Sequence, residues 1–569
     1  MYRFFLCGFS LLLICPPLVA LQVAELSVQR QQFQVQEIIP SKFGGWIFTV
    51  GSTPRLIWRD VDEMRRLGVE ATFRVRWFDG DLVEAAEPNH SGRWMAYVEG
   101  QAPNGTPLRR SFTFFALPEK LDAEAGPDLT IRFPNFPGPK TPAAWTEHQS
   151  EFDRLGRDFL MRGLLEGEKG AVLFAGLAES KQLGRPKKYS ESTSVVNDEY
   201  QLALKLKVLG QETGRGLQLP RIRQTPALVL QAASHPTASS RAVKAAIDDY
   251  CRAWAEATRE PFVIMVARQG EIITHEAFGS LPSGEPIDVE YRCWIASLTK
   301  TVTAILFSQF VDQGLIALDD QLSSVFPDYP SNDPHVPTFR QCLNHTSGLT
   351  GHGELGGMKN PHLENVVLNG IDVNQPLKVH QYCGLGFELA AKAMEMKARK
   401  CAMRIYDEHL FRPLDFGDVV MGNASSDGEF TASELAVLGQ WLANRGSYGE
   451  LEFISPQTFE ELLPKPLKVD GATQDQGLGL HWIRHLKPNA PPNSSRAEDF
   501  LFSRNTIGHG SFSGCILVVD LDQNLVIAQA RKRFTDADSE WYTRFFQTVA
   551  AALKSEPLPD RPKASSPKS

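Results

Sequence analysis

Short runs of alternating apolar and polar residues fill the chain between positions 21 and 118. The runs are GWIFTV, ATFRVRWF, RWMAYVEG and RRSFTFFALP, and turn signals such as FDGD and APNGTP separate them. Alternation with a period of two, broken by Gly, Pro, Asn and Asp, is typical of half-buried strands. The pattern predicts a β-rich domain over residues 21–118, a small sandwich or barrel, in which no catalytic constellation stands out.

Helical spacing replaces this alternation further along the chain. After a Pro-rich joint, AAWTEHQSEFDRLGRDFLMRGLLEG repeats its apolar residues at helical intervals. It predicts a helical or mixed segment over residues 119–235, with linkers near 181–197 and at ASHPTASSR. The run RAVKAAIDDYCRAWAEA predicts a further helix, capped by Ser239 or Ser240. Beyond it, PFVIMVARQGEIITHEAFGS predicts two strands that form a hairpin at RQGE.

The two ends of the chain differ from the rest. The first twenty residues combine Arg3, an apolar run and the small residue Ala20, which predicts an export signal over residues 1–20. The apolar run is shorter than the roughly 20 residues that a membrane span prefers, and two prolines interrupt it, so an uncleaved membrane anchor is the alternative. We therefore expect a periplasmic or secreted protein. Residues 556–569, rich in Pro and Ser, are predicted to be disordered.

Length and charge narrow the class of protein. A chain of 569 residues is too long for one ordinary core and indicates two or three domains. Its composition, 42% hydrophobic and 22% charged, is that of a soluble globular protein. A formal net charge of -8 over so long a chain leaves no basic footprint, so nucleic acid is not expected as a partner.

Six of the eight cysteines lie outside the predicted signal, all of them after position 250. No Cys-x-x-Cys pair occurs, so a structural zinc site has little support and no metal is expected. Six cysteines allow many disulfide connectivities, and the sequence does not choose among them. Buried, unpaired thiols that pack as small hydrophobic side chains are the default interpretation.

The run IASLTKTVTAILFSQF places Ser297 at the start of a predicted helix that stops near Gly314. The residues with the spacing of a buried helical face are Val302, Ile305, Leu306 and Phe310. Lys300, three residues after the serine, lies on the same side of the helix. A serine hydroxyl needs a base beside it to act as a nucleophile, and a lysine serves if burial lowers its pKa. The alternative is a helix-capping serine with a solvated lysine.

Spacing alone does not decide between these alternatives, because Ser565 and Lys568 repeat it in the Pro- and Ser-rich tail. The segments around and after Ser297 are more specific. They are YRCWIASLTKTVTAILFSQF, TFRQCLNHTSGLTGHG, QYCGLGFELAAKAMEMKARK, DGEFTASELAVLGQWLANRGSYG, QGLGLHW and IGHGSFSGCILVVDLDQNLVIAQARKR. Together they resemble the serine β-lactamase-related family: class C β-lactamases, D-Ala-D-Ala peptidases (penicillin-binding proteins) and related esterases. The resemblance spans roughly residues 240–552.

The resemblance implies an α+β fold for residues 236–555, with an antiparallel sheet flanked by helices, a mainly helical lobe and the site between them. It implies no metal or organic cofactor. Ser297 would be the acylated nucleophile, Lys300 its base, and Tyr382 a second base that relays a proton. The backbone N–H groups of Ser297 and Phe512 would form the oxyanion hole. The positions implied to contact substrate are Gly384, His509, Gly510 and Ser511.

Two of these positions depart from the family's pattern. Gly384 stands where the family's second motif, Tyr-x-Asn, has asparagine. The resemblance implies that this amide hydrogen-bonds the lysine and the acyl side chain of the substrate, so both contacts are left to water or to another residue. Ser511 stands where the third motif has a glycine that lets substrate lie along the strand. The missing asparagine argues against efficient β-lactam hydrolysis, but not against acyl transfer in general. Cys383, beside Tyr382, is either a buried thiol or a disulfide partner.

Three hypotheses follow for the function. The leading one is an exported serine hydrolase that forms an acyl-enzyme with an ester or a peptide-like amide, in the manner of an esterase or D-amino-acid peptidase. The second is a catalytically impaired binding or sensor module on the same fold. The third, a true β-lactamase, is the least favoured. The expected partners are a small-molecule or peptide-like acyl substrate and, through the N-terminal domain, the cell wall or envelope.

Overall fold

The computed structural model describes residues 73–90, 92–101, 107–117, 193–350, 357–368, 370–417 and 419–555, together with three short strands. These strands are β1 (Leu26–Val28), β2 (Trp46–Thr49) and β3 (Leu56–Trp58). The predicted export signal, the helix predicted at AAWTEHQSEFDRLGRDFLMRGLLEG and the predicted disordered tail lie outside the described residues. Among the described residues, no helix has the length and apolarity needed to span a membrane.

A five-stranded sheet with the order β2-β7-β6-β4-β5 accounts for most of the described residues before position 118. Its further strands are β4 (Phe73–Phe78), β5 (Glu84–Ala85), β6 (Gly92–Gln101) and β7 (Pro107–Leu117). Neighbouring strands are antiparallel except β2 and β7. Phe78, Met95 and Tyr97 of this sheet pack against Leu204 of helix α4 (Thr193–Leu209). Residues 193–197, predicted as part of a linker, therefore begin a helix that covers the sheet.

A seven-stranded sheet with the order β19-β20-β21-β22-β10-β11-β9 forms the centre of the described residues after position 230. Its strands are β9 (Gln231–Ala232), β10 (Phe262–Arg268), β11 (Glu271–Phe278), β19 (His481–Trp482), β20 (Thr506–Gly510), β21 (Ile516–Asp520) and β22 (Leu525–Arg531). All pairs are antiparallel except β11 with β9. Arg268 pairs with Glu271, which confirms the hairpin predicted at RQGE.

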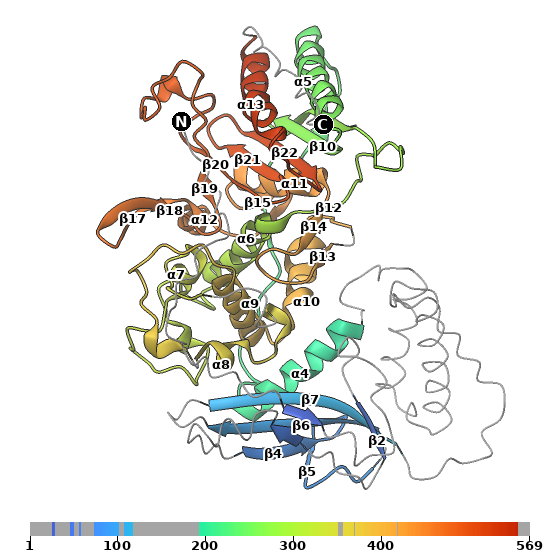
Figure 1. The fold of residues 1–569 in the computed structure, drawn as a ribbon, viewed down its shortest axis with the longest axis vertical. Coiled ribbons are helices and arrows are strands. Elements are labelled where there is room, and N and C mark those ends of the chain that lie inside the picture. The colour runs from blue at the N-terminus through green and yellow to red at the C-terminus, as the bar shows by residue number, and fades with distance from the viewer. Residues whose placement is uncertain are drawn as a thin grey trace, which may run out of the picture.

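Helices cover both faces of this sheet (Figure 1). On one face, α5 (Ala238–Thr258) packs beside α13 (Asp538–Lys554). On the other face lies α11 (Ala432–Ala443), where a β-carbon at Gly439 would come within 2.5 Å of Val526. Thr237 caps α5 by accepting from the N–H of Ser240, so the prediction of Ser239 or Ser240 as the cap was wrong.

The helical lobe lies between this sheet and the N-terminal sheet (Figure 1). Its helices are α6 (Thr299–Asp312), α7 (Phe339–Leu343), α8 (Leu363–Leu368), α9 (Leu385–Ala398), α10 (Ala402–Tyr406), the π-helical turn η9 (Asp407–Phe411) and α12 (Pro456–Leu462). Residues 299–310 of α6 are buried on every side, because this helix runs through the main hydrophobic core. The antiparallel sheet, its flanking helices and this lobe confirm the α+β fold predicted for residues 236–555.

Short strand pairs join these layers. β12 (Cys293–Trp294), β14 (Gly428–Phe430) and β13 (Val420–Met421) form one small sheet. β15 (Ser447–Tyr448), β16 (Leu451–Glu452) and β8 (Arg221–Ile222) form another, and β17 (Lys465–Val469) pairs with β18 (Ala472–Gln476). The six cysteines of residues 251–515 are free and buried, which confirms their default interpretation and makes Cys383 a buried thiol.

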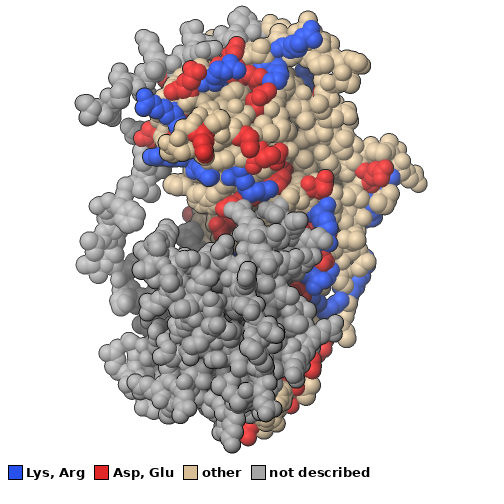
Figure 2. All heavy atoms as spheres, turned by 90° about the vertical axis from the view of Figure 1, so that its right-hand side faces the viewer, with Lys and Arg blue, Asp and Glu red and all other residues tan. Residues whose placement is uncertain are grey.

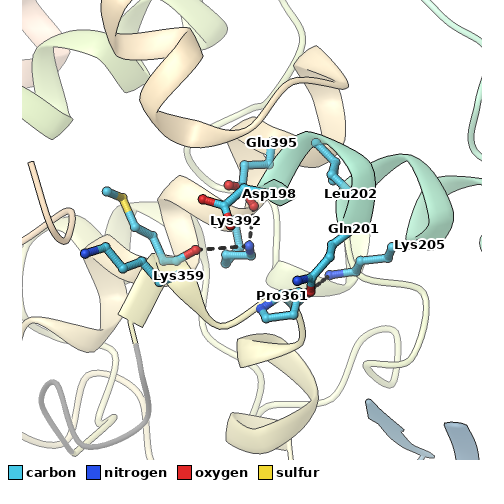
Figure 3. Close-up of a pocket in the computed structure, with 9 residues that line it drawn as sticks. Asp198, Gln201, Leu202, Lys205, Lys359, Pro361, Lys392 and Glu395 are labelled. Atoms are coloured by element: carbon cyan, nitrogen blue, oxygen red, sulfur yellow. Dashed lines mark hydrogen bonds and ion pairs between the residues drawn. The ribbon is translucent and has the colours of Figure 1, made fainter. Parts of the chain in front are cut away.

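Helix α4 joins the N-terminal sheet to the helical lobe through buried charges. Lys205 pairs with Glu364, and its ammonium also donates to the carbonyl of Pro361 at 2.9 Å. A polar cavity lies between α4 and α9, and Figure 3 shows Asp198, Lys392 and Glu395 meeting in it. Burial, followed by the charge of Glu395, raises the pKa of Asp198 to about 7. This junction is a charged contact of the fold, remote from the serine motif.

Charges of both signs are interspersed over the surface. In Figure 2, Lys and Arg side chains alternate with Asp and Glu over the part of this face that is described. No single-sign field of the kind that attracts nucleic acid is visible there.

Candidate active site

Ser297 lies in a tight 3-10 turn, η4 (Ala296–Leu298), that joins β12 to α6. Ala296 has φ +45°, a conformation that residues other than glycine rarely adopt. Ser297 itself is half-buried, whereas Ala296 and Leu298 on either side of it are buried. The chain therefore turns sharply at the serine and presents it at the start of the central helix. Strain of this kind persists only where the surrounding structure enforces it, and functional sites are common among such places.

Lys300 lies one turn into the helix, and its side chain is only 3% exposed. Its ammonium donates to the carbonyl of Ser425 at 2.8 Å and lies 4.6 Å from the centroid of the Tyr382 ring. Burial lowers the pKa of Lys300 to about 8, against the opposing charge of Glu388. A substantial neutral fraction is thus present near neutral pH, which a solvated lysine would not have.

Tyr382 lies in the segment before α9, and its side chain reaches that of Ser297. Burial raises the pKa of its phenol, and a hydrogen bond with the Ser297 side chain lowers it. The Tyr382 ring lies over that of His345, with 4.3 Å between their centroids. The structure therefore brings together Ser297, Lys300 and Tyr382, the three residues that the sequence assigned to the chemistry.

His345 belongs to the LNHTSGL block, residues 343–349, which ends α7 in a tight turn. His345 and Gly348 have positive φ values of 64° and 74°. The imidazole of His345 accepts from the N–H of Cys383 at 3.2 Å. This block thereby fixes the backbone beside Tyr382.

The third motif forms the end of β20, next to η4. The strand stops at the exposed Gly510. The Ser511 hydroxyl contacts that of Ser513 at 2.9 Å and donates to the carbonyl of Cys515 at 3.0 Å, so it serves the following turn. Within the described residues, the N–H groups of Ser297 and Phe512 have no acceptor. Two free N–H groups from adjoining turns are what an oxyanion hole requires.

Four histidines line the region around Tyr382. His509 lies 6.5 Å from the Tyr382 ring centroid and 4.8 Å from that of His481, and His345 lies 5.9 Å from that of His380. Burial lowers the pKa of His345 to about 2 and that of His509 to about 3, and lowers those of His380 and His481. These rings are neutral at neutral pH, which leaves Lys300 as the cation that acts on His345 and His509.

Sequence reasoning missed His380 and His481: His380 lies just before the QYC segment, and His481 lies in QGLGLHW, a segment to which no catalytic position was assigned. It also missed which side chain lies beside Gly384, the position at which the asparagine is absent. Gly384 lies at the N-terminus of α9, and a β-carbon there would come within 2.6 Å of the Ser425 hydroxyl. That hydroxyl donates at 2.7 Å to Glu388, a buried carboxylate on α9. Ser425 is far from Lys300 in sequence, so no local signal could have identified it.

Within the described residues, no group of three or more His, Cys, Asp or Glu side chains has an arrangement that could hold a metal ion. The donors near Ser297 are instead hydroxyl, amine, imidazole and backbone groups. This set is suited to acyl transfer by a serine nucleophile.

A sheet with helices on both faces, a helical lobe, and a serine, lysine and tyrosine between them define the class of serine β-lactamase-like proteins. The family described as Beta-lactamase matches residues 250–548, which is more than half of the chain. The protein therefore belongs to the Beta-lactamase family, which includes esterases and penicillin-binding proteins.

Individual relatives match shorter parts of the chain. Beta-lactamase-like protein 2 of Dictyostelium discoideum is 32% identical over 97 residues, which are 16% of this chain and 18% of that protein. Lovastatin esterase of Penicillium rubens is 25% identical over 39% of this chain and 68% of that enzyme. A penicillin-binding protein homologue of Caulobacter crescentus is 17% identical, with a TM-score of 0.44 over 58% of this chain and 100% of that one.

Proposed function

We propose that the protein is an exported serine hydrolase that cleaves esters through an acyl-enzyme. The convergence of Ser297, a buried Lys300 and Tyr382 carries this proposal. The Ser297 hydroxyl attacks the ester carbonyl and gives its proton to neutral Lys300, and the N–H groups of Ser297 and Phe512 hold the oxyanion. The tetrahedral intermediate then expels the alcohol, which receives a proton through Tyr382.

Hydrolysis of the acyl-enzyme completes the cycle. A water molecule attacks the carbonyl of the acyl-enzyme ester and gives its proton to Lys300 and Tyr382. The bond to Ser297 then breaks, and the serine oxygen takes back a proton from these two residues. Every proton that leaves a nucleophile is thus returned to a leaving group. The chain's own residues supply all these steps.

The surroundings of Ser297 support an uncharged substrate. His509, which the resemblance implies to contact substrate, has its pKa lowered to about 3 by burial, so its neutral imidazole would not act as a permanent cation for a substrate carboxylate. Two large apolar side chains are exposed beside these motifs: Trp294 at the end of β12, 39% exposed, and Phe512 in the turn after β20, 86% exposed. A neutral ester with an apolar acyl or alcohol part suits these walls better than a carboxylate-bearing β-lactam or peptide. The likeness to lovastatin esterase adds to this support.

Labelling by a fluorophosphonate probe tests the nucleophile. We expect the wild-type chain to be labelled and Ser297→Ala to lose the label, because only an activated serine reacts with the probe. Ser308→Ala is the matched control, since Ser308 lies on the same helix and bonds the carbonyl of Ile305. The labelled protein should hydrolyse p-nitrophenyl esters faster than nitrocefin. An unlabelled wild type, or a labelled Ser297→Ala, would contradict the proposal.

The second candidate is a catalytically impaired binding module, which the changes at Gly384 and Ser511 favour. Its Ser511 hydroxyl is committed to the turn, and no amide side chain is present at position 384. A module of this kind would bind an ester or a D-amino-acid peptide without turnover. Calorimetric titration of the wild-type chain with esters and D-amino-acid peptides separates the two candidates, because a binding module gives binding heat without hydrolysis product.

A further inference from the structure

We infer that Ser425 and Glu388 together replace the asparagine missing from the second motif: Ser425 holds Lys300, and Glu388 holds Ser425 and faces Lys300 with a negative charge. The inference rests on the proposed function, in which Lys300 is the base. It assigns both residues a positioning role, since neither touches the reacting atoms.

The first step concerns space. A β-carbon at Gly384 would come within 2.6 Å of the Ser425 hydroxyl and 3.1 Å of its β-carbon, distances at which one group must move. The Ser425 side chain therefore occupies the volume that a side chain at position 384 would need. Glycine at 384 and serine at 425 therefore fit together, and a side chain at position 384 would require the Ser425 side chain to move.

The second step concerns the lysine. The ammonium of Lys300 is buried, and a buried cation without a partner costs several kcal/mol. The carbonyl of Ser425 accepts from it at 2.8 Å. This bond directs the ammonium toward the Tyr382 ring, which lies 4.6 Å away. The carbonyl thus supplies the fixed acceptor that the side-chain amide would otherwise provide.

The third step concerns what holds Ser425. Its hydroxyl donates to Glu388 at 2.7 Å, and the same carboxylate accepts from the N–H of Ala424 at 3.0 Å. Asn423 accepts from the N–H of Ser425 at 2.9 Å, and the Trp294 indole donates to the carbonyl of Ser426 at 2.5 Å. The loop of residues 423–426 is therefore hydrogen-bonded both to α9 and to β12, the strand before Ser297.

The fourth step concerns charge. Glu388 lies on α9 one turn after Gly384, is only 4% exposed, and raises the pKa of Lys300 while burial lowers it. Burial in turn raises the pKa of Glu388. The other titratable groups that face Lys300 are His345 after α7, Tyr382 and Cys383 before α9, and His509 on β20. Among them Glu388 is the carboxylate.

Glu388→Gln tests the charge. We expect the midpoint of the pH dependence of kcat/KM for ester hydrolysis to move to lower pH by roughly 1 unit, because the charge that favours protonated Lys300 is removed. Glu395→Gln is the matched control, since Glu395 is buried on the same helix and pairs with Lys392. An unchanged midpoint, or one that moves to higher pH, would overturn the inference.

A second readout keeps the test independent of turnover. Competitive labelling of amines by acetic anhydride, read at Lys300 by mass spectrometry, measures the same midpoint in Ser297→Ala. A lower midpoint in Ser297→Ala/Glu388→Gln supports the inference even if esters are not hydrolysed, so failure of the hydrolase proposal is recognised separately. The same midpoint in both variants would overturn it.

Gly384→Asn tests the replacement itself. We expect the single variant to lose roughly 10- to 100-fold in kcat/KM, because the new side chain displaces Ser425 and with it Lys300. Gly384→Asn/Ser425→Gly should recover part of this loss, since the second change frees the volume that the amide needs. Circular dichroism checks that both variants fold. A single variant as active as wild type, or a double variant no better than the single, would show that Ser425 does not replace the amide.

Discussion

At the scale of residues, burial rather than spacing distinguishes SLTK from the same pattern in the tail. Lys300 is enclosed by the core that surrounds α6, and its ammonium donates to the backbone carbonyl of Ser425, which is distant in sequence. Desolvation disfavours its charged form, and this makes a lysine usable as a base. Tyr382 completes the arrangement because the LNHTSGL turn holds the backbone next to it.

The pH dependence of ester hydrolysis should report Lys300. The base must be neutral to accept the serine proton, so we expect kcat/KM to be low at pH 6, to rise with pH and to level off above a midpoint of about 8. The raised pKa of Tyr382 places its titration above this range. Lys300→Met should lose roughly 100-fold or more at pH 8. A profile that is flat from pH 6 to 9 would exclude Lys300 as the base.

Much of the candidate site could be predicted at this scale. Ser297, Lys300, Tyr382 and His509 each lie in a segment with its own motif, and these segments meet in the fold. Ser425 and Glu388 could not be predicted, because their role depends on a volume left empty at Gly384. An absent side chain has no pattern in the sequence, and only the packed loop shows what fills it.

At the scale of elements, helix α4 is the part of the chain whose charges are hardest to explain from sequence. Its polar appearance near 193–197 suggested a linker, but the helix places Asp198 beside Glu395, Lys392, Lys359 and Glu199. Tertiary packing overrides local composition here. The result is a carboxylate in a polar cavity with a raised pKa (Figure 3).

Asp198 should make the stability of the protein depend on pH. Its pKa rises from 3.8 to about 7 on folding, so the folded state binds the proton more tightly and stability falls as pH rises between these values. We expect Asp198→Asn to raise the free energy of unfolding at pH 8 by roughly 1–3 kcal/mol more than at pH 5. Denaturant titrations at both pH values measure this.

Glu199→Gln is the control for Asp198→Asn, since Glu199 is a neighbouring carboxylate that pairs with Arg404 and accepts from the N–H of Cys401. It should lose stability at both pH values. An equal gain for Asp198→Asn at pH 5 and pH 8 would show that Asp198 is already charged at the lower pH.

At the scale of the whole molecule, the N-terminal sheet and the helical lobe are joined by ion pairs. Lys205 with Glu364, and Arg109 with Asp328, connect segments that are far apart in sequence. Buried pairs of this kind contribute little net stability, but removing one partner leaves an uncompensated charge. We propose that the N-terminal sheet and α4 brace the lobe that carries Tyr382.

Lys205→Met should therefore destabilise the protein by about 3–5 kcal/mol, because the Glu364 carboxylate would stay buried without its cation. Lys205→Met/Glu364→Leu should recover most of the loss. Lys207→Met, on the exposed side of the same helix, serves as the comparison. Differential scanning calorimetry, which resolves separate transitions in a multi-domain chain, is the measurement. A double variant as unstable as the single would argue against a charge effect.

The sequence by itself determined the order of the motifs, the strands and helices whose periodicity is strong, and the α+β fold that these motifs imply. It could do so because periodicity and motif register are local properties of the chain. Only the tertiary structure decided that α4 packs on the lobe, that the neutral His345 and His509 lie against Tyr382, and that Ser425 fills the volume beside Gly384. These features depend on contacts between distant segments, whose energies come from burial and exclusion of water rather than from any local pattern.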